Sequence, residues 1–434
     1  MNSVGKVRVD TSPSKPTINQ LFSVFAKIGL LSFGGPAAQI SLMHFYIVNE
    51  KAWLTEKQYL NALSFCMLLP GPEAMQLATY AGWRIHGLVG GLIGGLLFVL
   101  PGAAIVLALA TVYAVYGDVP MVTALFLGIK AAVLIVVIEA LLRVSKKALK
   151  GRVYWLIAGL AYIGIFFFSI PYPVIILIAA FWGALLGWKN REITADTELP
   201  GVALGVTLKT VAIWLAIWWL PVLAVSYFLD QQILTDIAMF FSKLAVVTFG
   251  GAYAVLAYMG QDVVSQFGWL EPGEMIDGLG LAETTPGPLI LVTEFVGYIA
   301  AYRQGGILLG LAGAVLTLWV TFVPCFLWIF AGAPYIDWIS AQPRLAGALK
   351  AITAAVVGVI LNLSIWFGLH VLFEDVKKEQ VGILTLWNPE LNSIDWRVLV
   401  LSLLCAILLL RLHWNIVKVL LVSAFSGLML INLG

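Results

Sequence analysis

Residues 25–72 read FAKIGLLSFGGPAAQISLMHFYIVNEKAWLTEKQYLNALSFCMLLPGP, and residues 241–288 repeat this stretch at a constant offset of 216 positions, without a gap. Fourteen of the 48 aligned positions are identical. Chance matches between apolar sequences would be mostly leucine and valine, so matched Gly-Gly, Trp, Lys and Pro-Gly-Pro indicate a duplicated unit. The matches include Phe25 with Phe241, Lys27 with Lys243, Phe33-Gly34-Gly35 with Phe249-Gly250-Gly251, Trp53-Leu54 with Trp269-Leu270, and Pro70-Gly71-Pro72 with Pro286-Gly287-Pro288.

The composition indicates an integral membrane protein. The 434 residues are 61% hydrophobic and 11% charged, with a mean hydropathy of +0.97, a balance that no water-soluble domain of this size carries. A formal charge of +2 leaves no basic patch for nucleic acid. Cys66, Cys325 and Cys405 lie in apolar stretches without paired spacing, so we expect no disulfide, metal or cofactor. The polar N-terminal segment leads into further spans, so we expect no removable signal peptide.

Apolar stretches of about 20 residues predict an all-α polytopic membrane protein with roughly thirteen transmembrane helices. The predicted parts are a cytoplasmic N-terminal tail (1–20), an N-terminal membrane repeat (21–190), a linker with one extra transmembrane helix (191–236) and a C-terminal membrane repeat (237–434). Polar loops are expected at 189–207 and 373–396. The expected spans lie near 21–48, 58–82, 88–116, 121–142, 153–170, 172–188, 208–229, 237–260, 275–300, 306–333, 345–371, 396–411 and 413–432.

Six spans in each half and one between them would make the second half enter the membrane in the opposite sense, as an inverted repeat. Cytoplasmic loops should hold most Lys and Arg residues. With the N-terminus inside, the inside set is Lys6, Arg8, Lys15, Arg84, Arg143, Lys146, Lys147, Lys150, Arg152, Lys189, Arg191, Lys209, Arg344 and Arg411. The outside set is only Lys51, Lys57, Arg303, Lys377, Lys378 and Arg397. The bias predicts a cytoplasmic N-terminus and a periplasmic C-terminus.

Each half places a Gly-Gly step in its first span and a Pro-Gly-Pro in its second, where an unbroken helix would ordinarily be expected. Two prolines around a glycine should break the helix, and non-helical backbone at membrane depth is tolerated only inside the protein or beside a wet cavity. We therefore predict helices that restart at about Pro72 and Pro288 and direct free N–H groups at a central anion site. The alternative is that the glycines allow close helix packing and the prolines lie in surface loops. Two copies at equivalent positions of the halves favour the broken helices over this alternative.

Polar residues near these motifs are candidate ligands of the anion. Ser32 and Thr248 are equivalent hydroxyl donors, although each could instead bond back to its own helix. Lys27 and Lys243 lie five residues earlier and either supply positive charge or snorkel to the membrane surfaces. The predicted substrate-binding set is Lys27, Ser32, Gly34, Gly35, Pro70, Gly71, Pro72, Gln76, Lys243, Thr248, Gly250, Gly251, Pro286, Gly287 and Pro288.

The acidic residues differ between the halves. Glu73 has no acidic counterpart in the second half, and Glu283 and Glu294 have none in the first. A carboxylate beside an anion site would repel the substrate when charged and admit it when protonated, so we predict that Glu73, Glu283 or Glu294 carries a coupling proton. The alternative for Glu73 is a carboxylate that accepts bonds at a helix N-terminus. Arg84 and Arg303 are expected to be interfacial anchors or gate charges.

Further motifs accompany the repeat. The first half contains Ser32-Phe33-Gly34-Gly35-Pro36, Trp53-Leu54, Leu69-Pro70-Gly71-Pro72-Glu73 and Phe98-Val99-Leu100-Pro101-Gly102, and the second contains Thr248-Phe249-Gly250-Gly251-Ala252-Tyr253, Gly268-Trp269-Leu270 and Ala282-Glu283-Thr284-Thr285-Pro286-Gly287-Pro288. This ordered set, over about residues 20–330, resembles the long, two-domain branch of the chromate ion transporter family. Glu73-Ala74 departs from the small residue that many relatives carry after the first Pro-Gly-Pro. The resemblance implies a bacterial inner-membrane exporter of chromate, driven by the proton or ion gradient, that confers chromate resistance and could also recognise sulfate.

The residues and the resemblance together predict a secondary active oxyanion transporter, with protons or a counter-ion and membrane lipids as partners; the assembly state, a homodimer included, stays open. One alternative is a transporter or channel for sulfate or another small solute, such as an amino acid. Another is a membrane-embedded enzyme acting on a lipid phosphate, but no nucleophile, acid–base pair or metal site supports it. No Walker, His-Glu-x-x-His or Ser-His-Asp arrangement is present, so neither an ATP-driven pump nor an enzyme is expected.

Overall fold

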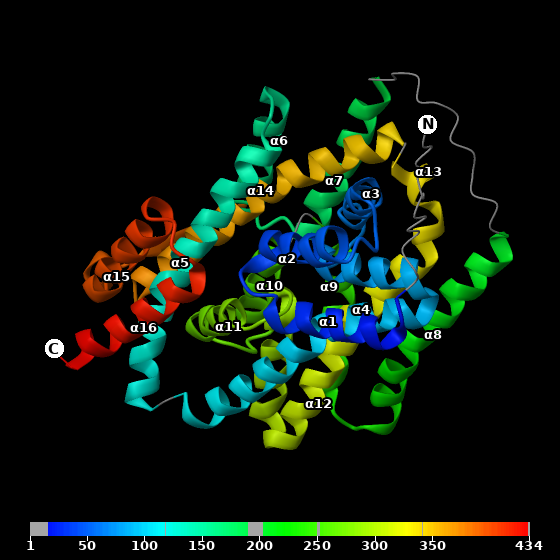
Figure 1. The fold of residues 1–434 in the computed structure, drawn as a ribbon. Coiled ribbons are helices and arrows are strands. Elements are labelled where there is room, and N and C mark those ends of the chain that lie inside the picture. Colours follow the sequence, from blue (N-terminus) through cyan, green and yellow to red (C-terminus); the bar gives the residue numbers. More distant parts are fainter. Residues whose placement is uncertain (1–15, 118, 190–202, 250–251, 341, 433–434) are drawn as a thin grey trace, which may run out of the picture.

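The computed structural model describes residues 16–117, 119–189, 203–249, 252–340 and 342–432, which are helical apart from one β hairpin (Figure 1). The first half contains α1 (Ile18–Leu31), α2 (Gly35–His44), which continues as a π-helical turn (Phe45–Glu50), α3 (Glu56–Cys66), α4 (Glu73–Tyr116), α5 (Pro120–Ala148), α6 (Arg152–Phe166) and α7 (Tyr172–Lys189). A linking helix, α8 (Leu204–Phe228), follows. The second half contains α9 (Gln232–Val247), α10 (Ala252–Gln261) with its π-helical turn (Asp262–Gln266), α11 (Pro272–Thr284), a 3-10 turn (Leu289–Leu291), α12 (Val292–Gly332), α13 (Ile336–Ser340), α14 (Pro343–Leu372), β1 (Val376–Val381), β2 (Leu384–Pro389), α15 (Trp396–Ala406) with its π-helical turn (Ile407–Arg411) and α16 (Ile416–Asn432).

The equivalent helices α3 and α11 begin with the same kind of cap and end before the same Pro-Gly-Pro sequence. At the start of α3, Thr55 accepts from the Gln58 backbone N–H while the Gln58 side chain accepts from the Thr55 N–H, a reciprocal cap. At the start of α11, 216 residues later, Glu271 and Glu274 form the same cap with carboxylates. Both helices then run into a Pro-Gly-Pro, so the same polar start and the same proline stop define each element.

The long helices α4 and α12 each consist of two arms that fold back on one another. Non-helical backbone interrupts α4 at His86-Gly87 and α12 at Gly305-Gly306, where Gly87 has φ +59° and Gly306 has φ +70°. A β-carbon on Gly94 would lie 2.4 Å from the Ala78 carbonyl oxygen, although 16 residues of straight helix span about 24 Å. Helix breaks are therefore present close to the predicted boundaries near 83–87 and 301–305.

Four of the predicted spans fold back on themselves. The Lys27 ammonium lies 4.7 Å from the Tyr46 ring centre, although 19 residues of straight helix span about 28 Å, so α1 and α2 form a helix hairpin with the glycine pair at its tip. The rings of Phe240 and Tyr258 are 6.1 Å apart across α9 and α10. In the fourth such segment, α3 packs against α4. The prediction of single spans over 21–48, 58–82, 237–260 and 275–300 is wrong. In three of these segments the described chain reverses at glycines with positive φ, namely Gly34-Gly35, Gly71 and Gly287.

The span 275–300 shows the reversal most directly. Arg303 Nη2 lies 2.6 Å from Glu274 Oε1, and its Nη1 donates to the Trp269 carbonyl at 2.7 Å. A straight helix between residues 274 and 303 would be about 43 Å long. The first arm of α12 therefore runs antiparallel to α11, with Pro286-Gly287-Pro288 at the tip between them.

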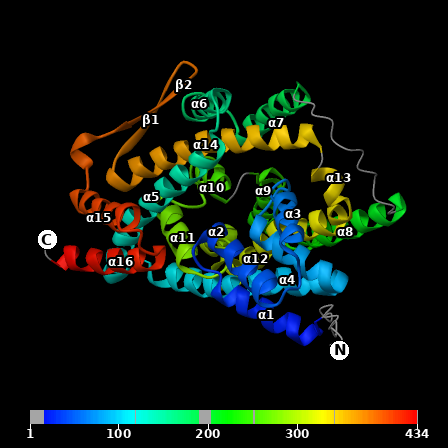
Figure 2. The same cartoon turned by 45° about the horizontal axis from the view of Figure 1, so that its top comes forward.

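The remaining helices of each half pack against those of the other. Helix α14 lies along α7 and α6, and α5 lies along α16 and α15 (Figure 2). Glycines allow the backbones to approach: a β-carbon on Gly183 would lie 2.4 Å from the Gly347 carbonyl oxygen, and one on Gly128 would lie 1.9 Å from the Ser423 carbonyl oxygen. Helices α4, α5, α8, α12 and α14 are long and apolar enough to cross a bilayer, and α1, α6, α7 and α16 are shorter apolar helices. The chain is a multi-pass membrane protein.

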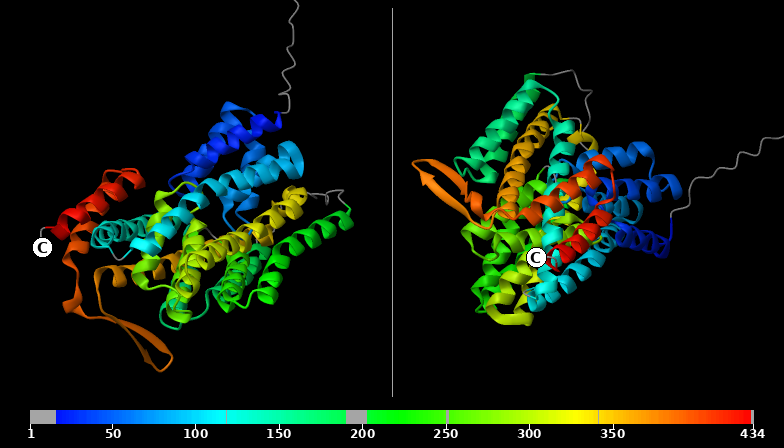
Figure 3. Two further views of the ribbon diagram at one scale, coloured as in Figure 1. Left: turned by 90° about the horizontal axis from the view of Figure 1, so that it is seen from below. Right: turned by 90° about the vertical axis from the view of Figure 1, so that its left-hand side faces the viewer.

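The predicted polar loop at 373–396 contains a β hairpin instead. Strands β1 and β2 pair antiparallel from Val376 with Pro389 to Val381 with Leu384, leaving a two-residue turn at Gly382-Ile383 in which Gly382 has φ +64°. The hairpin projects from the helical body (Figure 3). It docks there through the Thr385 N–H, which donates to the Phe167 carbonyl between α6 and α7 at 2.7 Å.

Candidate functional site

The tips of the four helix hairpins meet in two reciprocal backbone contacts. The Gly71 N–H donates to the Thr248 carbonyl at 2.8 Å, and the Gly287 N–H donates to the Ser32 carbonyl at 2.9 Å. Gly71 and Gly287 are equivalent under the 216-residue offset, and so are Ser32 and Thr248. Each Pro-Gly-Pro tip thus binds the opposite half beside its glycine pair, a self-complementary pairing typical of two-fold related units. We call the place where these two contacts meet, at Gly71 with Thr248 and Gly287 with Ser32, the crossing.

Glycine is required at these tips by conformation and by space. Gly71 has φ +116° and Gly287 has φ +95°, values that L side chains rarely adopt. A β-carbon on Gly71 would lie 2.8 Å from Cys325 Sγ, in the second arm of α12. Equivalently, a β-carbon on Gly102, in the second arm of α4, would lie 2.0 Å from the Pro286 carbonyl oxygen. The second arms of α12 and α4 therefore pack directly against the two Pro-Gly-Pro tips.

The predicted helix restarts are present. Helix α4 begins at Glu73 with Pro72 as its N-cap, and a 3-10 turn that leads into α12 begins directly after Pro288. Helix α2 begins at Gly35, directly after Gly34, and these glycines have φ +79° and +87°. First-turn amides of a helix have no partner within it, so these helix starts bring hydrogen-bond donors to the crossing. The predicted ligands Gly250 and Gly251 lie outside the described residues.

The two predicted hydroxyl ligands bond back to their own helices. Ser32 Oγ donates to the Ile28 carbonyl at 2.6 Å, and Thr248 Oγ1 donates to the Leu244 carbonyl at 2.5 Å. Both side chains are buried, at 0% and 4% exposure. In this conformation their protons are engaged, so only their oxygen lone pairs face other partners.

Two buried glutamines brace the crossing from the first half. Gln39 Nε2 donates to the Gly287 carbonyl at 2.6 Å and lies 3.3 Å from the Ser32 carbonyl. Gln76 Nε2 donates to the Pro70 carbonyl at 2.7 Å. The Oε1 atom of each glutamine is buried without a hydrogen-bond partner. Gln76 was predicted as a ligand, and Gln39, which is not in the predicted set, joins it at the tips.

The two equivalent lysines have different surroundings. Lys27 is exposed and stacks over Tyr46. Lys243 lies 5.9 Å from the Tyr258 ring centre and lines a cavity of about 430 Å³. Neither ammonium is within 4.0 Å of a carboxylate in the described part of the chain. Two cations are therefore available on the hairpins whose tips form the crossing.

The three candidate coupling carboxylates lie in different settings. Glu73 is partly exposed in the first turn of α4, the position that its helix-terminus alternative requires. Glu283 is 3% exposed and accepts a 2.6 Å hydrogen bond from the Tyr253 hydroxyl. Glu294 is fully buried in the first turn of α12, and neither of its oxygens has a hydrogen-bond partner among the described residues. An unpartnered carboxylate inside a membrane protein is costly when ionised.

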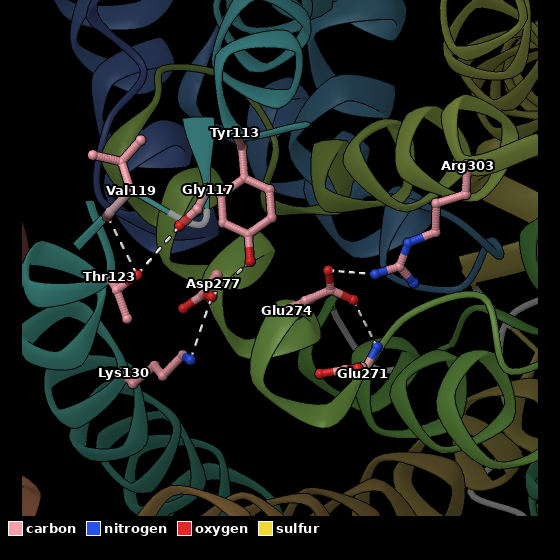
Figure 4. Close-up of polar contacts among 9 residues, drawn as sticks. All are labelled: Tyr113, Gly117, Val119, Thr123, Lys130, Glu271, Glu274, Asp277 and Arg303. Atoms are coloured by element: carbon pink, nitrogen blue, oxygen red, sulfur yellow. Dashed lines mark hydrogen bonds and ion pairs between the residues drawn. The ribbon is translucent and has the colours of Figure 1, made fainter. Parts of the chain in front are cut away.

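Sequence reasoning missed a buried ion cluster between α4, α5 and α11 (Figure 4). Asp277 Oδ2 accepts from the Tyr113 hydroxyl at 2.9 Å and lies 3.4 Å from Lys130 Nζ. Arg303, predicted as an anchor or gate charge, lies at the surface end of α11 through its pair with Glu274. The signal available in the sequence was the acidic residue inside an apolar segment, but its two partners come from distant segments. The other predicted anchor, Arg84, is exposed at the end of the first arm of α4.

The comparisons with known proteins agree on one family. The family model described as chromate transporter matches residues 19–187 and 235–428. The chain belongs to the chromate transporter family. Because one model matches both regions, this chromate transporter family member carries the family unit twice. The family is one of transporters and not of enzymes.

Relatives named for chromate transport cover most of this family member. A chromate transport protein of Pseudomonas aeruginosa is 33% identical over 80% of this chain and 80% of its own length, and one of Cupriavidus metallidurans is 30% identical over 81% and 82%. A probable chromate transport protein of Synechococcus elongatus is 27% identical over 85% and 89%. No solved structure matches this chain.

Proposed function

We propose that this protein exports chromate across the bacterial inner membrane by alternating access, coupled to the proton or ion gradient, and thereby confers chromate resistance. The observation that carries the proposal is the reciprocal contact between hairpin tips at Gly71 with Thr248 and Gly287 with Ser32. Two pairs of tips that bridge the halves at a buried crossing are suited to a site that opens first to one face and then to the other. The relatives named for chromate transport support the choice of substrate.

The fold-backs support an inverted arrangement of the halves. If the four tip hairpins re-enter the face from which they start, nine of the described segments cross: the second arm of α4, then α5, α6, α7 and α8, then the second arm of α12, α14, α15 and α16. The first unit then starts at the cytoplasmic face. Five membrane-spanning segments later, the second unit starts at the periplasmic face. Lys51 and Lys57 move to the cytoplasmic set, which sharpens the charge bias.

The proposed substrate site lies at the crossing. A tetrahedral dianion would accept hydrogen bonds from first-turn amides of α2 and α4 and from the Pro-Gly-Pro tips, with Ser32, Gln76 and Thr248 beside them. Lys27 and Lys243 would offset its charge from hairpins of opposite halves. The engaged hydroxyl protons and tip amides indicate that binding rearranges these hydrogen bonds, as expected of a site that must close around each substrate.

The proposed coupling groups are Glu73, Glu283 and Glu294. A negative carboxylate beside a dianion raises the free energy of the occupied site, and protonation removes that repulsion, so proton and anion movements become linked. In the described part of the chain, no hydrogen bond holds Glu294 ionised, and Glu283 accepts its side-chain hydrogen bond from the Tyr253 hydroxyl. These two are the stronger candidates, and Glu73 serves the helix terminus as well.

The test is chromate flux in vesicles that carry the glutamine variants of these three acids, measured from pH 6 to 8. At least one variant should keep chromate-for-chromate exchange and lose the pH dependence of net flux. If all three retain the parental pH dependence, the coupling assignment is wrong. Lys27→Gln and Lys243→Gln proteins, made at normal levels, should bind chromate more weakly, and sulfate as a competitor separates a chromate from a sulfate transporter.

A further inference from the structure

A polar cavity of about 430 Å³ lies beside α9, and Tyr172 of its wall donates to the carbonyl of Phe249, the residue after Thr248. The link between α6 and α7 forms one wall of the cavity. Helix α9 contributes Lys243, and helix α14 contributes Asn362. Helix α10 and its π-helical turn contribute Tyr258, Gln261 and Asp262. Strand β1 closes one side with Lys378. At about 30 Å³ per water, the volume holds about fourteen waters, enough for a small ion with much of its hydration shell.

The residues that line the cavity carry more positive than negative charge, and several of their hydrogen-bond donors have no acceptor among the described residues. Lys243 and Lys378 both line it, whereas Asp262 is the single acidic residue of its lining. Within the described parts of the chain, neither lysine has an ion pair within 4.0 Å. Among the described residues, the side-chain carboxamides of Asn362 and Gln261 have no hydrogen-bond partner. Lysine ammonium and amide N–H groups are donors that suit the oxygens of an anion.

The hairpin that closes this cavity has no counterpart in the equivalent link of the first half. The link from α14 to α15 is 23 residues long (373–395), whereas the equivalent link from α5 to α6 has three residues (149–151). The hairpin is held over the cavity by the Thr385 N–H to the Phe167 carbonyl and by a 3.0 Å hydrogen bond between the hydroxyls of Thr385 and Ser169. Lys378 stacks over the ring of Trp387 at 5.5 Å, which fixes the direction of its stem.

We propose that this cavity is a second anion site, a vestibule on the hairpin face in which a hydrated tetrahedral dianion is held by Lys378, the Asn362 carboxamide and Lys243, the lysine that also belongs to the proposed substrate site. The identity of the ion rests on the proposed function; the site itself rests on the cavity, its unpaired donors and the inserted hairpin. Because the hairpin has no counterpart in the first half, the vestibule raises the local anion concentration at one face of the transporter and not at the other.

Two neighbouring lysines supply a matched test. Lys377 and Lys378 are successive residues of β1 and point to opposite faces of the strand; Lys378 lines the cavity, whereas Lys377 pairs with Glu390. Lys378→Gln and Lys377→Gln remove the same charge from the same strand. Half-saturating chromate for exchange is measured with the anion presented to each face in turn, in right-side-out and in inverted vesicles of the full-length protein.

Lys378→Gln should raise the half-saturating concentration at the hairpin face roughly threefold to tenfold, the effect of one unit charge a few ångströms from a dianion in a wet site, and leave the opposite face unchanged. Lys378→Arg should restore the parental value and Lys377→Gln should keep it. Equal values for the two glutamine variants, or equal changes at both faces, would overturn the vestibule. Failure of the parent to exchange chromate at either face would instead overturn the proposed function.

Discussion

Replacing Gly102 by alanine tests the clamp on the second Pro-Gly-Pro tip. The new β-carbon would lie 2.0 Å from the Pro286 carbonyl oxygen and 2.7 Å from Leu291 Cδ1. A carbon and an oxygen ordinarily approach to about 3.3 Å, so the tip must retreat by about 1.3 Å. The 2.9 Å bond from the Gly287 N–H to the Ser32 carbonyl would then exceed the reach of a hydrogen bond. Overpacking costs about 1–3 kcal/mol and a lost hydrogen bond about 1 kcal/mol, so we expect a loss of about 2–4 kcal/mol.

The matched control is Gly159→Ala in α6. A β-carbon there has nothing within 4 Å, and helix propensity favours alanine by up to about 1 kcal/mol. Unfolding of both variants is followed by intrinsic fluorescence in detergent, and chromate exchange is measured in vesicles. We expect Gly102→Ala to unfold earlier and exchange poorly, with Gly159→Ala at or above the parental stability. If Gly102→Ala matches Gly159→Ala in both assays, the tip contact does not hold the crossing as described.

Three further predictions concern the ion cluster, the buried acid and the topology. Asp277→Asn and Lys130→Met should each lower the free energy of unfolding by about 3–5 kcal/mol, because each leaves a partner charge uncompensated, and the double variant should lose less than the sum; additive losses would show that the pair is not coupled. Glu294→Gln should keep or raise stability, since no oxygen of Glu294 has a hydrogen-bond partner to lose; a clear drop in unfolding temperature would contradict this. A membrane-impermeant thiol reagent added outside intact cells should label Arg303→Cys and spare Lys57→Cys, and the reverse pattern would refute the proposed orientation.

The repeat made the centre of the molecule predictable. Gly-Gly and Pro-Gly-Pro carry backbone requirements that are visible in a sequence, and the helix boundaries at Glu73 and Gly35 follow from them. Hydropathy could not tell a crossing helix from a helix hairpin of the same length, because both are equally apolar. The pair between Arg303 and Glu274, 29 residues apart, is the contact that reveals the reversal.

Other features depend on partners that are distant in the chain. Asp277 is an acid inside an apolar segment, but nothing local predicts that Tyr113 and Lys130 meet it. The β hairpin did leave a local signal, a glycine at the first turn position between two strand-like stretches, beneath a polar composition that suggests a loop. The sequence left two alternatives for the hydroxyls of Ser32 and Thr248, an anion or a carbonyl of their own helix. Both donate to the carbonyl four residues earlier in the structure.

The most direct test of the account is flux of radiolabelled chromate into inverted membrane vesicles from cells that make the protein, with an imposed proton gradient and with sulfate as competitor. We expect protein-dependent chromate accumulation that collapses when the gradient is dissipated and that sulfate reduces. Folded protein in the vesicles with no flux of either anion, or accumulation indifferent to the gradient, would contradict it.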